Sequence, residues 1–278
     1  MNYKVTRLDP FGVLLEPKNQ NTYIIDIDVE NLRQLFHKEQ LLLLRGFKSF
    51  KDADDFSNYC DSWGEIALWP FGKVLELIKH DNPEDHIFDH SYVPLHWDGM
   101  YRPQIPEYQI FHCVKAPLKG QGGRTTFSNT ILVLKNSASE DLSFWKNVTA
   151  SYERKMEFYH SKIVSALVTK HPYKDYYVIR YNEAPSIEKG DFINPPLIKF
   201  SGVNDLERGL FEKKLSQALY HEKNFYAHEW QNGDVVIADN FSLLHGREKF
   251  SAESPRHLRR VQVLSNPPIN NSELESYK

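Results

Sequence analysis

Three residues of this 278-residue chain have the side-chain types and spacing of a metal site. His96 and Asp98 stand two positions apart in VPLHWDGMY, and side chains two apart point to the same side of an extended chain. His245 ends an apolar run and precedes Gly246, which would let the backbone turn beside a cavity. Two imidazoles and one carboxylate on one face of an ion leave three positions open. Iron oxygenases and zinc hydrolases both use these ligands, so the three residues alone do not separate an oxygenase from a hydrolase.

Two arginines beyond His245 help to separate these alternatives. Arg256 and Arg260 follow it by eleven and fifteen residues in the strand-like segment SPRHLRRVQV. A buried guanidinium is costly unless an anion meets it, and a dicarboxylate such as 2-oxoglutarate offers matching bidentate geometry. Thr125, in GQGGRTTF, could supply a hydroxyl to the same anion. These residues favour an oxygenase that uses 2-oxoglutarate. Arg259, by contrast, is expected at an exposed strand end.

The motifs HWDGMY, GGRTTF and LLHGRE, together with the arginine pair, resemble the TauD/TfdA family of iron(II)/2-oxoglutarate-dependent dioxygenases. The resemblance covers most of the chain and implies a distorted double-stranded β-helix, or jelly roll. It also implies that His96, Asp98 and His245 are the metal ligands and the catalytic centre, holding Fe(II), with 2-oxoglutarate and O2 as co-substrates. Family members oxidise 2-oxoglutarate to succinate and take a hydrogen atom from the substrate.

The resemblance further implies how 2-oxoglutarate is held. Arg260 would pair with its distal carboxylate, helped by Thr125, and Arg256 would lie near the carboxylate that chelates the metal. A halogenase of this fold would have a small residue in place of the carboxylate ligand, so Asp98 argues against that alternative. Three alternatives stay open: a hydroxylase of another small carboxylate or sulfonate, a metal-dependent hydrolase, and a non-catalytic jelly-roll binding protein.

The segment that leads into the first metal motif suggests a substrate class. Residues 69–101 look like the PvcB-type branch of the family, which is associated with isonitrile natural products made from aromatic amino acids. That likeness implies oxidative decarboxylation or desaturation of a tyrosine isonitrile to a vinyl isonitrile. A pocket for an aromatic ring could be lined by five residues of the segment, namely Trp69, Phe71, Tyr92, Met100 and Tyr101. Lys73 or Arg180 could bind a substrate carboxylate, and the sequence does not choose between them.

Composition bounds the class of protein. Charged residues make up 26% of the chain, the net charge is -3, and no block of like charge occurs, so neither a nucleic-acid nor a membrane partner is expected. Cys60 and Cys113 lack the spacing of a zinc site or a disulfide scaffold and are expected to be buried thiols. No signal peptide and no apolar run of about 18 residues is present. We therefore expect a cytoplasmic enzyme with a small-molecule substrate. The sequence leaves open whether the chain self-associates.

The elements that must position these residues form a mainly β pattern with flanking helices, expected as one domain over residues 1–278. Apolar periodicity predicts helices at 29–40, 52–64, 132–148 (interrupted by loops) and, most regularly, 205–222. Ser49 is a possible cap of the second helix. Short apolar or alternating runs predict strands at 21–28, 41–47, 74–80, 108–117, 233–240, 242–248 and 258–265, with a hairpin from 162–171 and 176–184.

Overall fold

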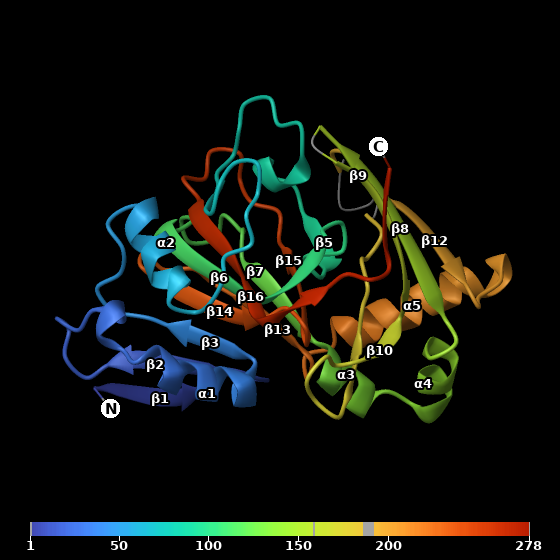
Figure 1. Ribbon diagram of the computed structural model, residues 1–278, viewed down its shortest axis with the longest axis horizontal. Helices are drawn as coiled ribbons and strands as arrows, with labels where there is room; N and C mark the ends of the chain where they lie inside the picture. The colour runs from blue at the N-terminus through green and yellow to red at the C-terminus, as the bar shows by residue number, and fades with distance from the viewer. Residues whose placement is uncertain (1, 158, 186–191, 278) are drawn as a thin grey trace.

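Two facing sheets form the centre of the computed structural model, which describes residues 2–157, 159–185 and 192–277 (Figure 1). The larger sheet has the order β1-β2-β3-β14-β6-β16-β4, and only the β2–β3 pair is parallel. Its strands are β1 (Tyr3–Arg7), β2 (Val13–Pro17), β3 (Leu41–Leu44), β14 (Val235–Asp239), β6 (Gln104–Lys115), β16 (His257–Asn270) and β4 (Leu75–Leu77). The smaller sheet has the order β13 (Phe225–His228), β7 (Thr125–Asn129), β15 (Leu243–Arg247) and β5 (Val93–His96).

The central strands of the larger sheet are apolar on both faces because each face packs against a different core. In β3, Leu41 and Leu43 point into the core between the two sheets, whereas Leu42 and Leu44 point into a second core on the outer face. Strands buried on both faces read as continuous apolar runs rather than alternating ones. The inner core also receives Phe111 from β6 and Phe127 from β7, so the two sheets pack face to face. This arrangement is the jelly roll that the sequence led us to expect.

Two helices cover the outer face of the larger sheet, at the blue end of the chain in Figure 1. Helix α1 (Val29–Glu39) begins after Asp28, whose side chain accepts from the amide of Glu30. Helix α2 (Ala53–Asp61) begins after Asp52, whose side chain accepts from the amide of Asp55. Both predicted helices are confirmed, but the cap of the second one is Asp52 rather than Ser49. Cys60 and Cys113 are buried and unpaired, as expected.

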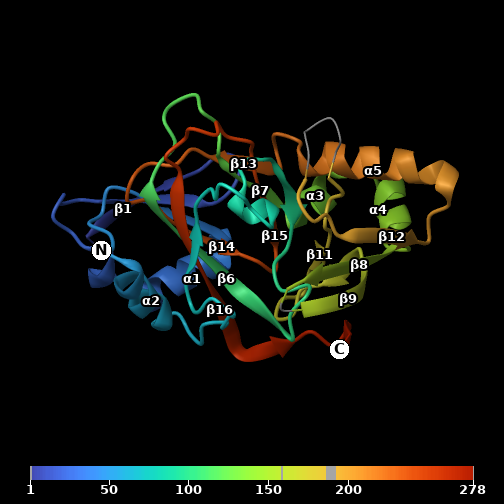
Figure 2. The same cartoon turned by 90° about the horizontal axis from the view of Figure 1, so that it is seen from above.

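The other half of the molecule packs around a third core (Figure 2). It contains a sheet of order β12 (Leu197–Ser201), β8 (Thr149–Met156), β9 (Tyr159–Ala166) and β17 (Leu274–Tyr277), and a short hairpin of β10 (Val168–Lys170) and β11 (Tyr177–Ile179). Helices α3 (Thr130–Asn136), α4 (Ser139–Trp145) and α5 (Asp205–Leu219) lie in the same half. The interrupted helix at 132–148 and the long helix at 205–222 are thus confirmed. In the described part of the chain, no helix is both long and apolar enough to cross a membrane.

Two predicted elements differ from the structure. Residues 21–28 form no strand; they contain the short 3₁₀ helix η1 (Ile24–Asp26). Ile24 and Ile27 are buried while Ile25 is 65% exposed, so the apolar contacts repeat every three residues rather than every two. The predicted hairpin is shorter than expected, because residues 162–166 belong to β9 and pair with β8 and β17. A second 3₁₀ helix, η2 (His86–Phe88), lies in the long connection from β4 to β5.

Candidate metal centre

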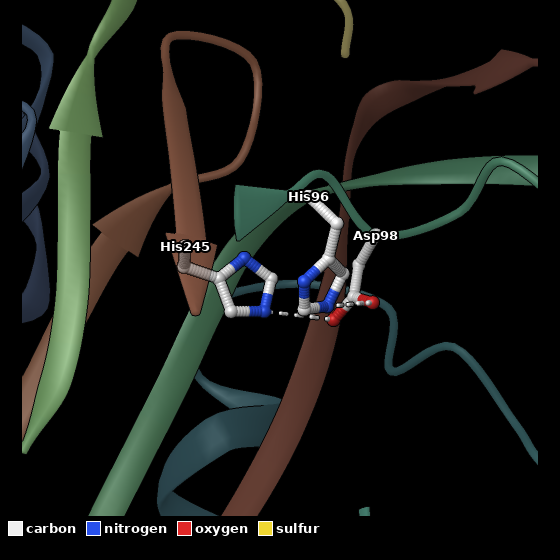
Figure 3. Close-up of side chains that lie close together, drawn as sticks. All are labelled: His96, Asp98 and His245. Atoms are coloured by element: carbon white, nitrogen blue, oxygen red, sulfur yellow. Dashed lines mark ion pairs between the residues drawn. The ribbon is translucent and has the colours of Figure 1, made fainter. Parts of the chain in front are cut away.

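The three predicted metal ligands meet at one edge of the smaller sheet (Figure 3). His96 ends β5 and pairs in register with His245 of the neighbouring β15, while Asp98 follows in the next turn. The Nε2 atom of His96 lies 3.7 Å from Oδ1 of Asp98, and the Nε2 atom of His245 lies 3.6 Å from Oδ2. Because protein ligands stand about 2.0–2.2 Å from a bound metal, such separations suit one shared ion. We call these three residues the triad.

Gly246 acts differently from the expectation that it lets the chain turn. It lies inside β15, and a Cβ atom there would stand 2.6 Å from the carbonyl oxygen of Val93 and 3.0 Å from Oγ1 of Thr126. The absence of a side chain therefore lets β5 and β7 lie close to both sides of β15. This close approach helps to bring His96 next to His245.

The carboxylate of Asp98 is oriented by three donors on one oxygen. Its Oδ2 accepts from Nε2 of Gln109 and Nε2 of Gln262, each at 2.7 Å, and from the guanidinium of Arg260 at 2.8 Å. These donors leave Oδ1, which faces His96, as the oxygen better placed to bind an ion. Burial would raise the pKa of Asp98, but Arg260, the two imidazoles and Gln109 hold it well below its usual range. The carboxylate is thus ionised at any physiological pH.

The main chain of Asp98 is clamped by one buried amide. Oδ1 of Asn240 accepts from the Asp98 amide at 2.8 Å, and its Nδ2 donates to the Asp98 carbonyl at the same distance. The Nδ2 group also donates to the carbonyl of Pro106. Asn240 follows β14, so the central strand of the larger sheet helps to position the candidate ligand Asp98.

The two imidazoles are held in the neutral form that binds metals. Nδ1 of His96 lies 2.9 Å from the carbonyl oxygen of Pro94, which fixes the proton there and leaves Nε2 facing the triad. Burial lowers the pKa of His96, and burial together with neighbouring His96 lowers the pKa of His245 to about 3. The donor set of two neutral imidazoles and one carboxylate fits ferrous iron.

A small cavity beside the triad holds the second expected group of residues. At one end Arg256, 5% exposed, donates from Nε to the carbonyl of Gly123 at 3.0 Å. Burial and nearby Arg247 lower the pKa of Arg256 to about 9, and no carboxylate of the described residues lies within ion-pair distance of it. A buried guanidinium without a carboxylate partner would be stabilised by an anionic ligand. The cavity is lined by Leu77, Ile87, Val93, His96, Phe111, Thr125, His245, Gly246, Arg247, Arg256 and Arg260.

The two arginines of this cavity have different partners, and which of them pairs with which carboxylate of 2-oxoglutarate stays a prediction. Arg260 was expected at the distal carboxylate of 2-oxoglutarate, but its guanidinium is bonded to Asp98 at the metal end of the cavity. Arg256 instead bonds to Gly123, and Thr125 lines the same cavity and accepts a hydrogen bond from Nε1 of Trp230 at 3.0 Å. Arg259 is not exposed either: its side chain is 12% exposed and pairs with Glu76 at 3.0 Å.

A second, larger cavity is also lined by His96 and Asp98 of the triad and has a volume of about 880 Å³ counting its open mouth. Four of the five residues predicted to bind an aromatic substrate line it: Trp69, Phe71, Met100 and Tyr101. Other aromatic walls are Tyr159, which stacks on Tyr101 at 5.8 Å, and Phe192. We call this space the aromatic cavity.

Three residues proposed for the substrate lie elsewhere. Tyr92 is not among the lining residues and donates its hydroxyl to Glu183 at 2.9 Å. Lys73 forms an exposed ion pair with Asp61. Arg180 lies 4.6 Å from the ring of Trp97 and donates to the carbonyl of Asn240, so it supports the centre rather than lining the cavity.

Besides the predicted His96, Asp98 and Arg260, the aromatic cavity is lined by polar residues that sequence reasoning missed. Arg154, from β8, forms an ion pair with Asp85 and lies 3.0 Å from Nδ1 of His86. All three line the cavity, and Asp85 and His86 are buried. No local pattern marks them, because they come from segments about 70 residues apart. Gln109 and Gln262 did leave a signal, since each is a lone amide in an apolar strand run.

A two-sheet jelly roll with this triad and a buried arginine beside it defines an iron(II)/2-oxoglutarate-dependent oxygenase. Residues 5–262 match the family model described as Taurine catabolism dioxygenase TauD, TfdA family, and the chain therefore belongs to this family. It is an oxidoreductase that uses Fe(II), 2-oxoglutarate and O2. The hydrolase and the non-catalytic binding protein are accordingly set aside.

Several known proteins are similar to this chain in sequence or in fold. The chain is 43% identical over 265 residues to a tyrosine isonitrile desaturase of Pseudomonas aeruginosa, covering 95% of this chain and 91% of the relative. It is 39% identical to 3-((Z)-2-isocyanoethenyl)-1H-indole synthase of Fischerella ambigua, covering 94% and 96%. Its fold is similar to the structure of PvcB, an Fe, alpha-ketoglutarate dependent oxygenase from an isonitrile synthetic pathway, with a TM-score of 0.84 and 39% identity over 99% and 96% of the two chains. A taurine dioxygenase from Burkholderia xenovorans, 16% identical with a TM-score of 0.71 over 100% and 97%, shares the fold.

Proposed function

We propose that this enzyme introduces a double bond next to the isonitrile group of a tyrosine-derived isonitrile, by desaturation or by oxidative decarboxylation to the vinyl isonitrile. The observation that carries the proposal is the aromatic cavity, which is lined by His96 and Asp98 of the triad. Its size and its rings suit a single phenol-bearing substrate. The relatives named for isonitrile chemistry, among them a tyrosine isonitrile desaturase, support the same substrate class.

The proposed reaction balances with the co-substrates of the family. Iron and 2-oxoglutarate, when bound, supply the oxidation: O2 takes two electrons from 2-oxoglutarate and two from the substrate. Desaturation yields the unsaturated acid, succinate, one CO2 and water. Oxidative decarboxylation yields the vinyl isonitrile, succinate, two CO2 and water, because the substrate carboxylate leaves in place of a second hydrogen.

The chain's own residues hold the reactants. We propose that His96, Asp98 and His245 bind iron, with Asp98 binding through Oδ1. The distal carboxylate of 2-oxoglutarate would pair with Arg256 and accept a hydrogen bond from Thr125, while Arg260 stays on Asp98. This assignment follows the positions of the two arginines in the cavity.

Within the aromatic cavity, Arg154 is the candidate partner of the substrate carboxylate. It is a largely buried cation on the cavity wall, with a side chain 13% exposed. Its neighbour Asp85 fixes it in place, and the rings of Tyr101 and Tyr159 would exclude water from the substrate. A substrate held at both its ring and its carboxylate would place its benzylic carbon toward the triad.

Incubation with tyrosine isonitrile, Fe(II), 2-oxoglutarate and air tests the proposal. We expect substrate-dependent succinate and a product lighter by two hydrogens, or by CO2 and two hydrogens. A product heavier by one oxygen would instead identify a hydroxylase of the same substrate. Asp98→Ala is the control, because it removes a proposed ligand and should abolish succinate release. Turnover of another small carboxylate or sulfonate, with none of tyrosine isonitrile, would refute the proposal.

We also propose that the enzyme works in the cytoplasm on a freely diffusing small molecule. Two buried cysteine thiols and a dependence on ferrous iron are both suited to a reducing compartment. Nucleic-acid binding is not expected from the net charge of -3, and self-association stays an open prediction. The elution volume of the purified protein against standards would settle its oligomeric state.

A further inference from the structure

Trp69 forms part of the wall of the aromatic cavity and is held in a tight turn. The main chains of Trp69 and Gly72 bond to each other in both directions, at 3.1 and 2.9 Å. The indole stacks on Phe71 with ring centroids 5.6 Å apart, and the guanidinium of Arg102 lies 4.5 Å from its ring. These contacts leave Trp69 half-buried, and it is one of the residues that line the cavity.

Two hydrogen bonds connect this indole to the triad. Nε1 of Trp69 donates to Oε1 of Gln262 at 2.9 Å, and Nε2 of Gln262 donates to Oδ2 of Asp98 at 2.7 Å. Gln262 lies on β16, the dark red strand that passes behind Asp98 in Figure 3. Gln262 is 3% exposed, so water does not compete for these two hydrogen bonds. Because the amide is planar, a rotation imposed at its oxygen also moves its NH2 group.

A second glutamine, Gln109, bonds to Asp98 in the same way but has no bond to Trp69 in the described part of the chain. Gln109 faces Gln262 across the β6–β16 pair and donates to the same oxygen of Asp98 at the same 2.7 Å. Its carbonyl oxygen, however, is buried and has no hydrogen-bond partner among the described residues. Both glutamines support the carboxylate, but of these two only Gln262 is also bonded to Trp69.

We propose that Gln262 is a positioning residue that couples occupation of the aromatic cavity to the orientation of the metal-binding carboxylate, through the chain Trp69–Gln262–Asp98. A ligand that presses on the indole would shift the Gln262 amide and, with it, Asp98. Coupling of this kind is reciprocal in binding affinity, and because the coupling runs through the hydrogen bonds of Gln262, we expect metal binding at Asp98 to change the surroundings of Trp69 as well. The proposal rests on the proposed function only for the identity of the ligand.

The reciprocal effect can be measured without substrate or turnover. Zn²⁺, which lacks d-electron quenching, is titrated into the metal-free protein while tryptophan emission is recorded. Since the chain has five tryptophans, the contribution of Trp69 is the difference between each protein and its Trp69→Phe version. Circular dichroism checks that every variant is folded.

The expected result separates the two glutamines. The wild-type background should show a Zn²⁺-dependent change in Trp69 emission. Gln262→Leu should remove most of it, while the matched control Gln109→Leu should retain it, although both variants lose one donor to Asp98. A change that persists in the Gln262→Leu background, or that is lost equally in both, would overturn the proposal, as would its absence in the wild type.

A second measurement tests the coupling with ligand. The affinity for Zn²⁺ is determined with 2-oxoglutarate, with and without tyrosine isonitrile. We expect the ligand to change the affinity by about 5-fold or more in the wild type and in Gln109→Leu, at the lower end of typical coupling. In Trp69→Phe and Gln262→Leu the ratio should fall toward one, and an unchanged ratio in Trp69→Phe would contradict the proposal. If tyrosine isonitrile does not bind the wild type at all, the proposed function fails, whereas the emission test of Gln262 stands by itself.

Discussion

Arg256 is expected to oppose folding and to be required for 2-oxoglutarate at the same time. Burial lowers the pKa of its guanidinium from 12.5 to about 9. Each pKa unit corresponds to about 1.4 kcal/mol, so at neutral pH the buried charge costs the empty protein up to about 5 kcal/mol. Arg256→Met keeps much of the side-chain volume and removes the charge, but it also removes the bond to Gly123, worth about 1 kcal/mol.

The metal-free Arg256→Met variant should therefore be more stable than the wild type. After structural relaxation we expect a gain of about 2 kcal/mol, or a rise in Tm of about 4 °C for a chain of this size, measured by calorimetry. Its 2-oxoglutarate requirement should rise at least about 100-fold, because losing one partner of a buried charge pair costs about 3–5 kcal/mol. Anaerobic titration of the ferrous protein, followed by its visible charge-transfer band, measures this requirement.

Arg259→Met is the matched control. Arg259 lies three residues further along and pairs with Glu76, so its loss should not raise Tm and should leave the 2-oxoglutarate requirement unchanged. If Arg256→Met changes that requirement by less than about threefold, or lowers Tm, then Arg256 is not the anion partner and the reasoning from its burial is wrong.

Three further predictions follow from other parts of the site. Asn240→Leu removes three buried hydrogen bonds around Asp98; we expect a loss of about 2–4 kcal/mol in urea unfolding and at least about tenfold weaker metal binding by titration. Arg154→Gln should raise KM for tyrosine isonitrile much more than that for 2-oxoglutarate, and an equal rise in both would argue against a substrate contact. Burial and nearby Asp239 raise the pKa of Glu107 to about 7, so the folded protein keeps a proton that the unfolded chain loses above its ordinary value of 4.5. Stability should then fall by up to about 3 kcal/mol as pH rises from 4.5 through 7, and urea unfolding of Glu107→Gln should show a flatter profile.

The sequence was most informative where the chemistry is local. His96 and Asp98 are two residues apart, and a two-residue period alone brings them to one side of the chain. His245 and the arginines were found by their spacing along one segment. Spacing does not say which arginine lies beside Asp98, so the roles of the two arginines stay predictions. Arg260 lies within the strand beside Asp98, whereas Arg256 precedes the strand and a register shift at His257.

Contacts between distant segments account for the rest of what was missed. The wall around Arg154 is built from β8 and from the β4–β5 connection, and only the packed fold brings them together. Tyr92 belongs to the predicted segment but does not line the cavity; its hydroxyl bonds to Glu183, which does. Residues 21–28 contain too few apolar positions to distinguish a period of two from a period of three.

Gly246 has a consequence for anyone who wishes to redesign the centre. The lateral spacing of β5, β15 and β7 depends on a missing methyl group, since a Cβ atom at Gly246 would collide with the backbone of Val93. The distance between the imidazoles of His96 and His245 therefore depends on Gly246, a residue with no side chain to bind a metal. Gly246→Ala is expected to push β5 away from β15 and so increase the distance between the imidazoles of His96 and His245, while every donor atom stays in the chain. Metal selectivity could then be altered without replacing a candidate ligand.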